Sequence, residues 1–251
     1  MGSATRIVPM EIGRLDSALR GLTGDPGRAV LPVPSWLIEH RDGLMLFDTG
    51  MHVGLRADAT RLAKIISDTH VDFPVGEDLS ARLGSAGYRP TDVTVVAISH
   101  LHFDHAGGTA EIPNARLIVQ RAEWDAGHHP KLVEFGVYTP SEFDVGHDLE
   151  LIEGDHDVFG DGSVVCISTP GHTKGHQSLR VQLASGPVVL TADCVYFGSM
   201  LDEMRLPVFG FDKPQQLTSM RRLASMRDDG CRLLFGHDLD QFRSLPTEGW
   251  A

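Results

Sequence analysis

The stretch that decides the fold is Ser99-His100-Leu101-His102-Phe103-Asp104-His105, which directly follows the apolar run VTVVAI at residues 93–98. That run is too short for a helix and is rich in β-branched residues, so it predicts a buried strand. Residues i and i+2 of an extended backbone point to the same side, so His100 and His102 can converge on one metal ion. The sequence therefore predicts a metal site at the end of a buried strand.

Asp104 and His105 come next, where the chain turns, and they are placed to reach a second ion close to the first. Imidazole and carboxylate groups together are the ligand set that zinc favours. One segment cannot complete two coordination spheres, so further ligands are expected at later strand ends. His172, Asp193 and His237 each come just after an apolar run, and such loops commonly carry function. Together these positions give seven predicted ligands.

Composition and charge narrow the class of partner. The chain has 251 residues, of which 41% are hydrophobic, and its formal net charge is −12. The apolar fraction is sufficient for a sizeable core, and the negative charge would repel a polyanion. Nucleic acid is therefore not expected as a partner, and a neutral or weakly polar small molecule suits the chain better.

The three cysteines, Cys166, Cys194 and Cys231, are scattered and form no CxxC pair. An odd number of isolated cysteines does not indicate a set of disulfide bonds, so a reducing, cytoplasmic compartment is expected. Cys194 follows Asp193, and on an extended strand it would point to the opposite face, into the core. Because the N-terminus lacks a basic segment followed by an apolar run, and no apolar stretch could span a bilayer, we expect neither a signal peptide nor a membrane partner.

Strand and helix patterns interleave along the chain, and no linker divides it. Ser35–Glu39 and Leu44–Phe47 flank an Asp-Gly turn and predict a hairpin. Further predicted strands are Leu117–Val119, Val164–Ser168, Ser178–Leu183, Val188–Thr191 and Arg232–Phe235, and predicted helices are Ala57–Ile66, Gly76–Leu83 and Pro214–Met226. We expect one α/β domain over residues 1–251. Two packed sheets with outer helices and one doubly wound sheet both fit, and periodicity alone does not choose between them.

The other histidines have weaker signals. His128 and His129 lie in a polar loop that ends in proline, and His40 has no clustered partner. His176 follows His172 by four residues, and it is expected to support that loop by hydrogen bonding rather than to bind a metal.

The HxHxDH motif at His100–His105, followed by His172, Asp193 and His237, resembles the metallo-β-lactamase superfamily. The resemblance covers nearly the whole chain. It implies an αββα sandwich in which the metals lie at one edge, between the two sheets.

Within that superfamily the chain is similar to the quorum-quenching N-acyl homoserine lactone lactonases. The segments that carry this resemblance are SHLHFDHAGG (99–108), LIVQRAEW (117–124), TPGHTKGHQSL (169–179), FGFD (209–212) and LFGHDLDQ (234–241). The resemblance implies that Phe103, Tyr196 and Gly210 bind the substrate, and that Asp48 supports the metal ligands. Thr173-Lys174 departs from the Ser-Pro of many relatives, and the first 30 residues match only loosely; both regions lie near the expected position of the acyl chain.

The implied cofactor is a pair of Zn²⁺ ions, with Co²⁺, Mn²⁺ or Fe²⁺ as alternatives. The implied reaction is the opening of the lactone ring by a hydroxide that bridges the metals, with Asp193 bridging them as well. Tyr196 would donate a hydrogen bond to the lactone carbonyl, and Asp104 would carry a proton to the leaving oxygen. Asp104 and Tyr196 are thus the predicted catalytic residues.

Two alternatives stay open at this point. One is another lactonase or a thioesterase of the same fold, such as a hydroxyacylglutathione hydrolase. The other is a redox or sulfur-handling metalloprotein of the fold, although members that carry di-iron have Glu at the position of His102. The expected partner is a small lactone, and a homodimer is an open alternative to a monomer.

Overall fold

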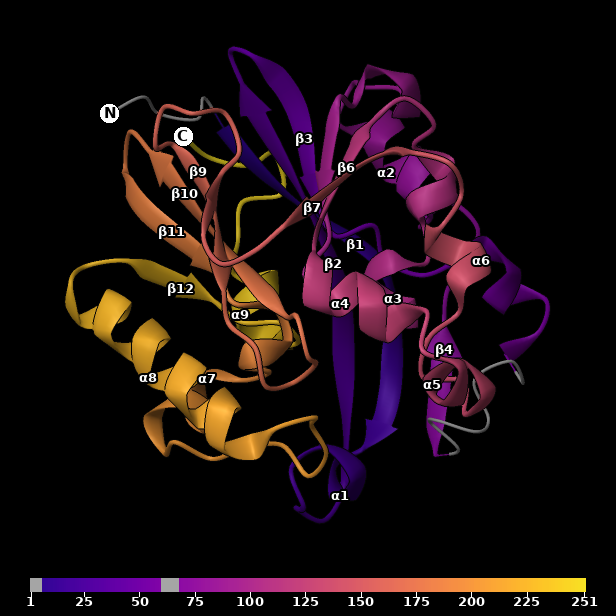
Figure 1. Ribbon diagram of the computed structural model, residues 1–251, viewed down its shortest axis with the longest axis vertical. Coiled ribbons are helices and arrows are strands. Elements are labelled where there is room, and N and C mark those ends of the chain that lie inside the picture. The colour runs from indigo at the N-terminus through magenta and orange to yellow at the C-terminus, as the bar shows by residue number, and fades with distance from the viewer. Residues whose placement is uncertain (1–5, 60–67) are drawn as a thin grey trace.

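Two β-sheets pack face to face between two layers of helices in the computed structural model (Figure 1). The structure describes residues 6–59 and 68–251. Within this part of the chain the larger sheet has seven strands, in the spatial order β4 (Thr69–Asp72), β1 (Arg6–Ala18), β2 (Arg28–His40), β3 (Gly43–Phe47), β5 (Val95–Ala97), β6 (Arg116–Gln120) and β7 (Asp148–Ile152). The smaller sheet has five strands, in the order β12 (Arg232–Leu234), β11 (Gly186–Leu190), β10 (Gln177–Leu183), β9 (Val164–Ser168) and β8 (His156–Asp157).

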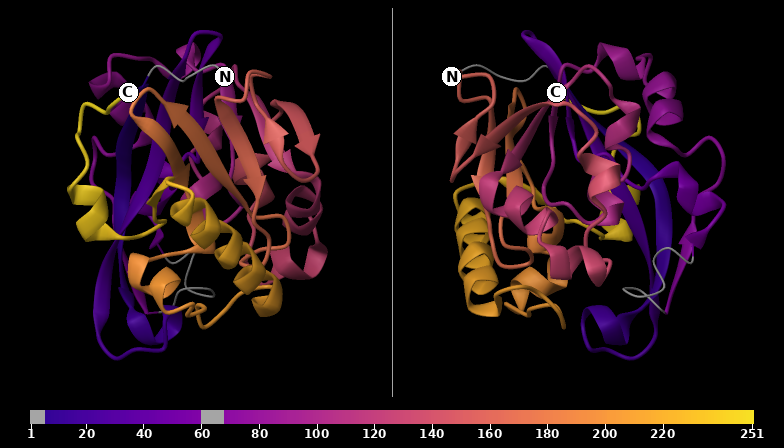
Figure 2. Two further views of the ribbon diagram at one scale, coloured as in Figure 1. Left: turned by 90° about the vertical axis from the view of Figure 1, so that its left-hand side faces the viewer. Right: turned by 45° about the vertical axis from the view of Figure 1, so that its right-hand side comes forward.

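Helices cover the outer faces of both sheets. The α-helices are α1 (Leu19–Leu22), α2 (Leu79–Ser85), α3 (Phe103–Ala106), α4 (Arg121–Gly127), α5 (Pro130–Glu134), α6 (Pro140–Phe143), α7 (Gly198–Asp202), α8 (Lys213–Asp228) and α9 (Leu239–Arg243). Short 3₁₀ turns are η1 (Val53–Arg56), η3 (Pro90–Asp92), η4 (Thr109–Glu111) and η5 (Ala192–Cys194). Figure 2 shows α8 lying across the outer face of the smaller sheet.

The period-two alternation of strand side chains divides the apolar residues among three layers of core. In β3, Met45 and Phe47 point into the core between the two sheets, whereas Leu46 points to the core under the outer helices of the larger sheet. In β9, Cys166 faces the central core and Ile167 faces a third core beneath α7 and α8. The αββα sandwich is therefore confirmed, and the doubly wound alternative is excluded.

Most of the predicted elements are confirmed. The hairpin is formed by β2 and β3, with His40 paired to Gly43 across the turn. The helix predicted to begin at Gly76 begins at Leu79 instead, because the Asp78 side chain accepts a hydrogen bond from Ala81 N and caps the helix there. Most of the helix predicted over Ala57–Ile66 lies outside the described residues.

The long strand β1 was not predicted from the sequence. Its register shifts between Glu11 and Arg14, and Gly13 between them has a φ of 76°. This bulge interrupts the alternation of apolar and polar residues on which a strand prediction depends.

Polar side chains tie the two sheets together close to the end of β5. The Gln177 side chain in β10 donates a hydrogen bond to Ile98 O (2.8 Å) and accepts one from Gln120 Nε2 of β6 (3.0 Å). Ser99 O also accepts a hydrogen bond from Gln177 N (2.9 Å). These bonds fix the start of the histidine-rich segment relative to the smaller sheet. In the described part of the chain, no helix combines the length and apolar character that crossing a membrane requires.

Candidate metal centre

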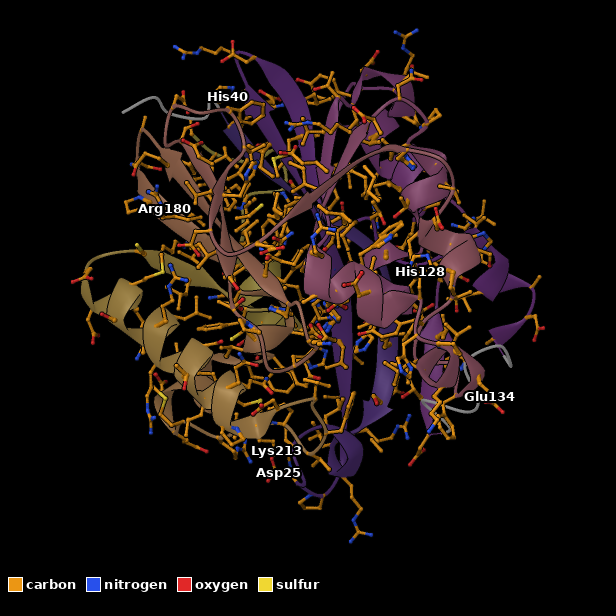
Figure 3. The ribbon with its side chains drawn as sticks, viewed as in Figure 1. Asp25, His40, His128, Glu134, Arg180 and Lys213 are labelled. Carbon is orange, nitrogen blue, oxygen red and sulfur yellow. The ribbon has the colours of Figure 1, made fainter. Side chains whose placement is uncertain are left out.

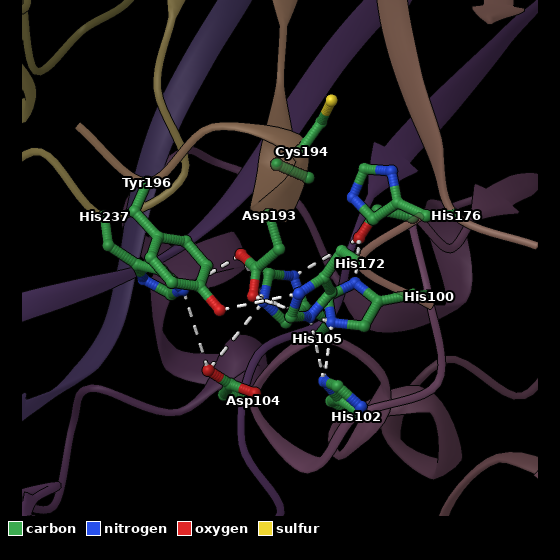
Figure 4. Close-up of polar contacts among 12 residues, drawn as sticks. His100, His102, Asp104, His105, His172, His176, Asp193, Cys194, Tyr196 and His237 are labelled. Atoms are coloured by element: carbon green, nitrogen blue, oxygen red, sulfur yellow. Dashed lines mark hydrogen bonds and ion pairs between the residues drawn. The ribbon is translucent and has the colours of Figure 1, made fainter. Parts of the chain in front are cut away.

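The seven predicted ligands meet at one edge of the sandwich, where strands of both sheets end (Figure 4). From the larger sheet, β5 leads into the loop that carries His100 and His102 and then into α3, which carries Asp104 and His105. The smaller sheet supplies the other three: His172 from the loop between β9 and β10, Asp193 from η5 after β11, and His237 after β12.

The first group of ligands consists of three imidazoles and one carboxylate. His102 Nδ1 lies 2.9 Å from His100 Nε2 and 3.2 Å from His172 Nε2. Asp193 Oδ2 lies 3.3 Å from His172 Nε2 and 3.7 Å from His100 Nε2. All four ligand atoms lie within 4.8 Å of one another.

The second group consists of Asp104, His105 and His237. Asp104 Oδ2 lies 3.7 Å from His105 Nε2 and 3.9 Å from His237 Nε2. The other oxygen of Asp193, Oδ1, lies 3.2 Å from His105 Nε2 and 3.0 Å from His237 Nε2. Each carboxylate oxygen of Asp193 therefore faces a different group.

Hydrogen bonds outside the cluster fix the tautomers of two histidines. His105 Nδ1 lies 2.8 Å from Asp48 Oδ2, and His237 Nδ1 lies 2.9 Å from Pro32 O. Both partners are acceptors, so each Nδ1 carries a proton, and each Nε2 is the nitrogen that faces the centre. Asp48 also accepts hydrogen bonds from Ser99 N and Ser99 Oγ, at 2.6 and 2.8 Å, which is the supporting role expected of it.

Unpartnered polar atoms test whether these residues fit a metal. Among the described residues, buried His105 Nε2 and Asp193 Oδ1 make no hydrogen bond of normal geometry. In the first group, three imidazole nitrogens crowd together, and one proton can serve only two of them. A divalent cation would satisfy these lone pairs together, and nitrogen with carboxylate oxygen is the donor set of zinc. The residues present therefore fit metal ions.

The charges of the cluster balance one another. Burial and the neighbouring histidines lower the pKa of His100, and burial lowers the pKa of His172 despite the Asp193 carboxylate. Burial also opposes the charged form of His105, but Asp193, Asp104 and Asp48 outweigh it and raise its pKa. For Asp193, burial is outweighed by His237, His105 and His172, and its pKa lies well below the usual range. Asp193 therefore keeps its negative charge, while His100 and His172 are neutral and can offer nitrogen lone pairs to a cation.

A cavity of about 320 Å³ opens onto the centre, and both Asp104 and Tyr196 line it. Its apolar lining consists of Leu15, Leu22, Leu31, Phe103, Leu132, Val137, Phe209 and Phe211. Phe103 is therefore at the expected place. Gly210 packs beside Gln216 and His172 and, among the described residues, is not part of the lining, which its neighbours Phe209 and Phe211 supply.

Tyr196 is buried beside the metal ligands. Its hydroxyl lies 3.5 Å from His172 Nδ1, and the two rings are 5.8 Å apart. Burial, followed by the charges of Asp193 and Asp104, raises the pKa of the phenol well above its usual value. The phenol therefore keeps its proton and can act as a hydrogen-bond donor.

The sequence did not reveal the role of Glu123, which is fully buried in α4. Its Oε1 accepts hydrogen bonds from Leu101 N (3.0 Å) and from the Tyr138 hydroxyl (3.1 Å), and its Oε2 accepts one from Gly175 N (2.9 Å). One carboxylate thus joins the loop of His102 to the loop of His172. A Cβ at Gly175 would collide with Glu123 N, so only glycine allows this close approach.

Cys194 and His176 lie where the sequence analysis expects them, but the local structure at Cys194 differs from the expectation. Cys194 is buried in the core, as expected, but it lies in the 3₁₀ turn η5 and not on an extended strand, so the reasoning from alternate strand faces is wrong. Figure 4 shows its sulfur pointing away from the ligands. His176 hydrogen-bonds Thr169 Oγ1 at 2.9 Å and supports the loop. His40 and His128 lie far apart, on different sides of the molecule (Figure 3).

Comparisons with known proteins agree with this geometry. The family model of the metallo-beta-lactamase superfamily matches residues 28–237. An N-acyl homoserine lactonase of a Bacillus species is 35% identical over 245 residues, which cover 94% of this chain and 93% of the relative. The N-acyl homoserine lactonase AttM of Azorhizobium caulinodans is 31% identical over 253 residues, covering 96% of this chain and 95% of the relative.

Among solved structures, an N-acyl homoserine lactone hydrolase superposes with a TM-score of 0.86 at 30% identity. The match covers 98% of both chains. That structure contains the product N-hexanoyl-L-homoserine at its catalytic metal centre.

The Glu123 carboxylate provides a test of how the centre is held together. Glu123→Gln keeps the size of the side chain but turns an NH₂ group toward one of the donors. We expect the free energy of unfolding, measured by urea denaturation, to fall by about 1–3 kcal/mol, and zinc affinity to fall with it. Glu134→Gln is the matched control, because Glu134 is exposed at the edge of the molecule (Figure 3). Equal behaviour of the two variants would contradict a role for Glu123 in joining the ligand loops.

Proposed function

The chain belongs to the metallo-beta-lactamase superfamily, and from this premise we propose that it is a metal-dependent lactonase that opens the ring of N-acyl homoserine lactones. The observation that carries the proposal is the position of Asp193, whose two oxygens face two groups of ligands at the base of a largely apolar cavity. Relatives that align over nearly the whole chain are lactonases of this class, which supports the choice of substrate.

Two divalent cations, with Zn²⁺ as the first choice, would occupy the centre. His100, His102 and His172 would hold one ion, Asp104, His105 and His237 would hold the other, and Asp193 would bind both. When bound, the ions would polarise the lactone carbonyl and make a water molecule nucleophilic near neutral pH.

The protein supplies the positioning and the protons of the reaction. The neutral Tyr196 phenol donates a hydrogen bond to the lactone carbonyl oxygen, and this bond strengthens as that oxygen gains negative charge. The carboxylate of Asp104 lines the cavity and lies beside His105 and His237. From there Asp104 Oδ can accept the proton that the attacking water gives up and pass it to the ring oxygen as it leaves.

The rest of the cavity suits the remainder of such a substrate. Phe209 and Phe211 are largely exposed at the cavity, whereas Leu15 and Leu31 are buried, so an acyl chain would leave water along this wall. Phe103 extends the apolar wall at the metal ligands, and Gly210 lies in the sequence between the two phenylalanines of the opposite wall. The net charge of −12 is compatible with an uncharged lactone.

The substrate class is tested by identifying the product. Metal-loaded protein should convert N-hexanoyl homoserine lactone into N-hexanoyl homoserine, with base consumed in a pH-stat and the amide intact by mass spectrometry. Homoserine lactone together with free hexanoic acid would instead identify an acylase. A panel that includes thioesters of hydroxy acids distinguishes the thioesterase alternative, which would turn them over faster than any lactone.

The metal content provides a second test. Seven ligands exceed the requirement of one tetrahedral ion, so elemental analysis should give two metals per chain. Asp193→Ala is expected to lower both metal content and rate, because both groups lose an oxygen. Cys194→Ser is the control, since the adjacent thiol is buried in the core and should leave metal content largely unchanged. Full activity with a single metal per chain would refute the paired site, and iron with a visible absorption band would favour a redox member of the fold.

Tyr196→Phe separates catalysis from metal binding. This substitution removes the hydroxyl and keeps the ring, so metal content and stability should stay close to those of the parent. Loss of the hydrogen bond to the carbonyl should cost about 1–3 kcal/mol, or roughly ten- to hundredfold in kcat/KM. His100→Ala, by contrast, should lose metal and nearly all activity together. Parental rates in Tyr196→Phe would mean that the tyrosine only packs.

A further inference from the structure

One buried side chain outside the ligand set reaches the turn that carries Asp193. This side chain is Gln216, which lies near the start of α8 and is fully buried. Its Nε2 donates to the backbone carbonyls of Asp193 and Cys194, at 3.3 Å each. An amide nitrogen carries two hydrogens, so it can bind both carbonyls at once. Among the described residues, this amide is the donor that reaches these two carbonyls.

The turn needs support because its backbone is strained. Ala192 has a φ of 44°, and Asp193 follows it in η5. Side chains bind the carbonyls that come before Asp193: Ser178 Oγ donates to Thr191 O at 3.0 Å, and Thr191 Oγ1 donates to Ala192 O at 3.2 Å. Gln216 extends this set of contacts to the residue that carries the carboxylate.

Helix α8 also holds the loop of His172. Ser219 Oγ, one turn after Gln216, donates to Pro170 O at 2.7 Å. A Cβ at Gly171 would collide with the backbone of α8, so only glycine allows the loop and the helix to approach so closely. Because α8 contacts both loops, it fixes the loop of His172 relative to the turn of the bridging carboxylate.

The oxygen of the same amide faces the segment that lines the cavity. A Cβ at Gly210 would lie 3.0 Å from Gln216 Oε1, and Gly210 lies in the sequence between Phe209 and Phe211 of the cavity wall. Among the described residues, Oε1 is buried and accepts no hydrogen bond of normal geometry. An apolar side chain would fill this space without burying an amide, so the donor end of Gln216 is the part that the position needs.

We propose that Gln216 is a positioning residue of the metal centre: its amide holds the turn of Asp193 against the loop of His172, so that one carboxylate faces both groups of ligands. The inference rests on the proposed pair of metal ions and not on the choice of substrate. Gln216 acts through the backbone of Asp193. Without the amide the strained turn can relax, and the carboxylate leaves the position in which its oxygens lie 3.3 Å from His172 and 3.0 Å from His237.

The test removes the amide and measures metal binding. Gln216→Met keeps a side chain of similar length and volume. We expect the affinity for zinc, measured by competition with a chelator, to fall about tenfold, which is typical when a group that supports metal ligands is lost. The visible spectrum of bound Co²⁺ depends on coordination geometry, so it should shift as well. Gln215→Met is the matched control, because Gln215 is the neighbouring residue and is exposed; it should behave like the parent.

A second variant disturbs the same contact from the other side. Gly210→Ala leaves α8 and the amide intact, but its methyl group would press on Gln216 Oε1 and move the amide away from the two carbonyls. We expect the affinity for zinc to fall in this variant too, by less than in Gln216→Met, with a shift of the Co²⁺ spectrum in the same direction.

The remaining outcomes overturn the inference. A Gln216→Met protein that is less stable in urea without metal, yet binds zinc and Co²⁺ as Gln215→Met does, would show that Gln216 only packs. If Gln216→Met does not fold, Gly210→Ala decides the question, and parental zinc affinity together with a parental Co²⁺ spectrum would overturn the inference. A parent protein that binds no zinc would refute the proposed metal pair itself, before any variant is compared.

Discussion

The structure depends most on the buried carboxylate of Asp193, because histidines from loops of both sheets surround it. One oxygen lies 3.3 Å from His172, and the other lies 3.0 Å from His237 and 3.2 Å from His105. A lone buried carboxylate would be costly, and here imidazoles on both sides stabilise it so strongly that its pKa falls despite complete burial. The same centre brings the nitrogens of His100, His102 and His172 together, and a cation between them would satisfy their lone pairs. The αββα sandwich supplies the rigid strand ends that hold such an arrangement in place.

The backbone is strained at two positions close to the centre. Asp48 and Ala192 have φ values of 62° and 44°, in the left-handed region that side chains other than glycine rarely adopt. Asp48 is held there by the Ser35 hydroxyl, which donates to its carbonyl, and by its own side chain, which accepts two hydrogen bonds from Ser99. Ala192 begins the 3₁₀ turn that directs Asp193 between the two groups of ligands. Each such conformation destabilises the folded state by about 1–3 kcal/mol. It persists only where the surrounding contacts hold the residue in place.

The sequence was informative where chemistry is concentrated in short segments. His100 to His105 lie within six residues at a strand end, and His172, Asp193 and His237 each follow an apolar run, so the sequence alone indicated which side chains would meet in one cluster. Glu123 gave no such signal, because a glutamate in the first turn of a helix is usually an exposed residue. Its burial becomes apparent only when the loops of His102 and His172 are both present to donate to it. Strand β1 also gave no clear signal, because the bulge at Gly13 interrupts the alternation of apolar and polar residues that predicts a strand.

The candidate metal ligands and the cavity wall differ in how far the sequence can predict them. The candidate metal ligands follow the ends of strands β5, β9, β11 and β12, where the register of the two sheets fixes every position. The cavity wall comes from widely separated segments: Leu15 from β1, Leu132 from α5, Thr173 from a ligand loop, and Phe209 and Phe211 from the segment before α8. No local sequence pattern shows that these side chains lie together. The type of reaction can therefore be predicted from the sequence more readily than the substrate.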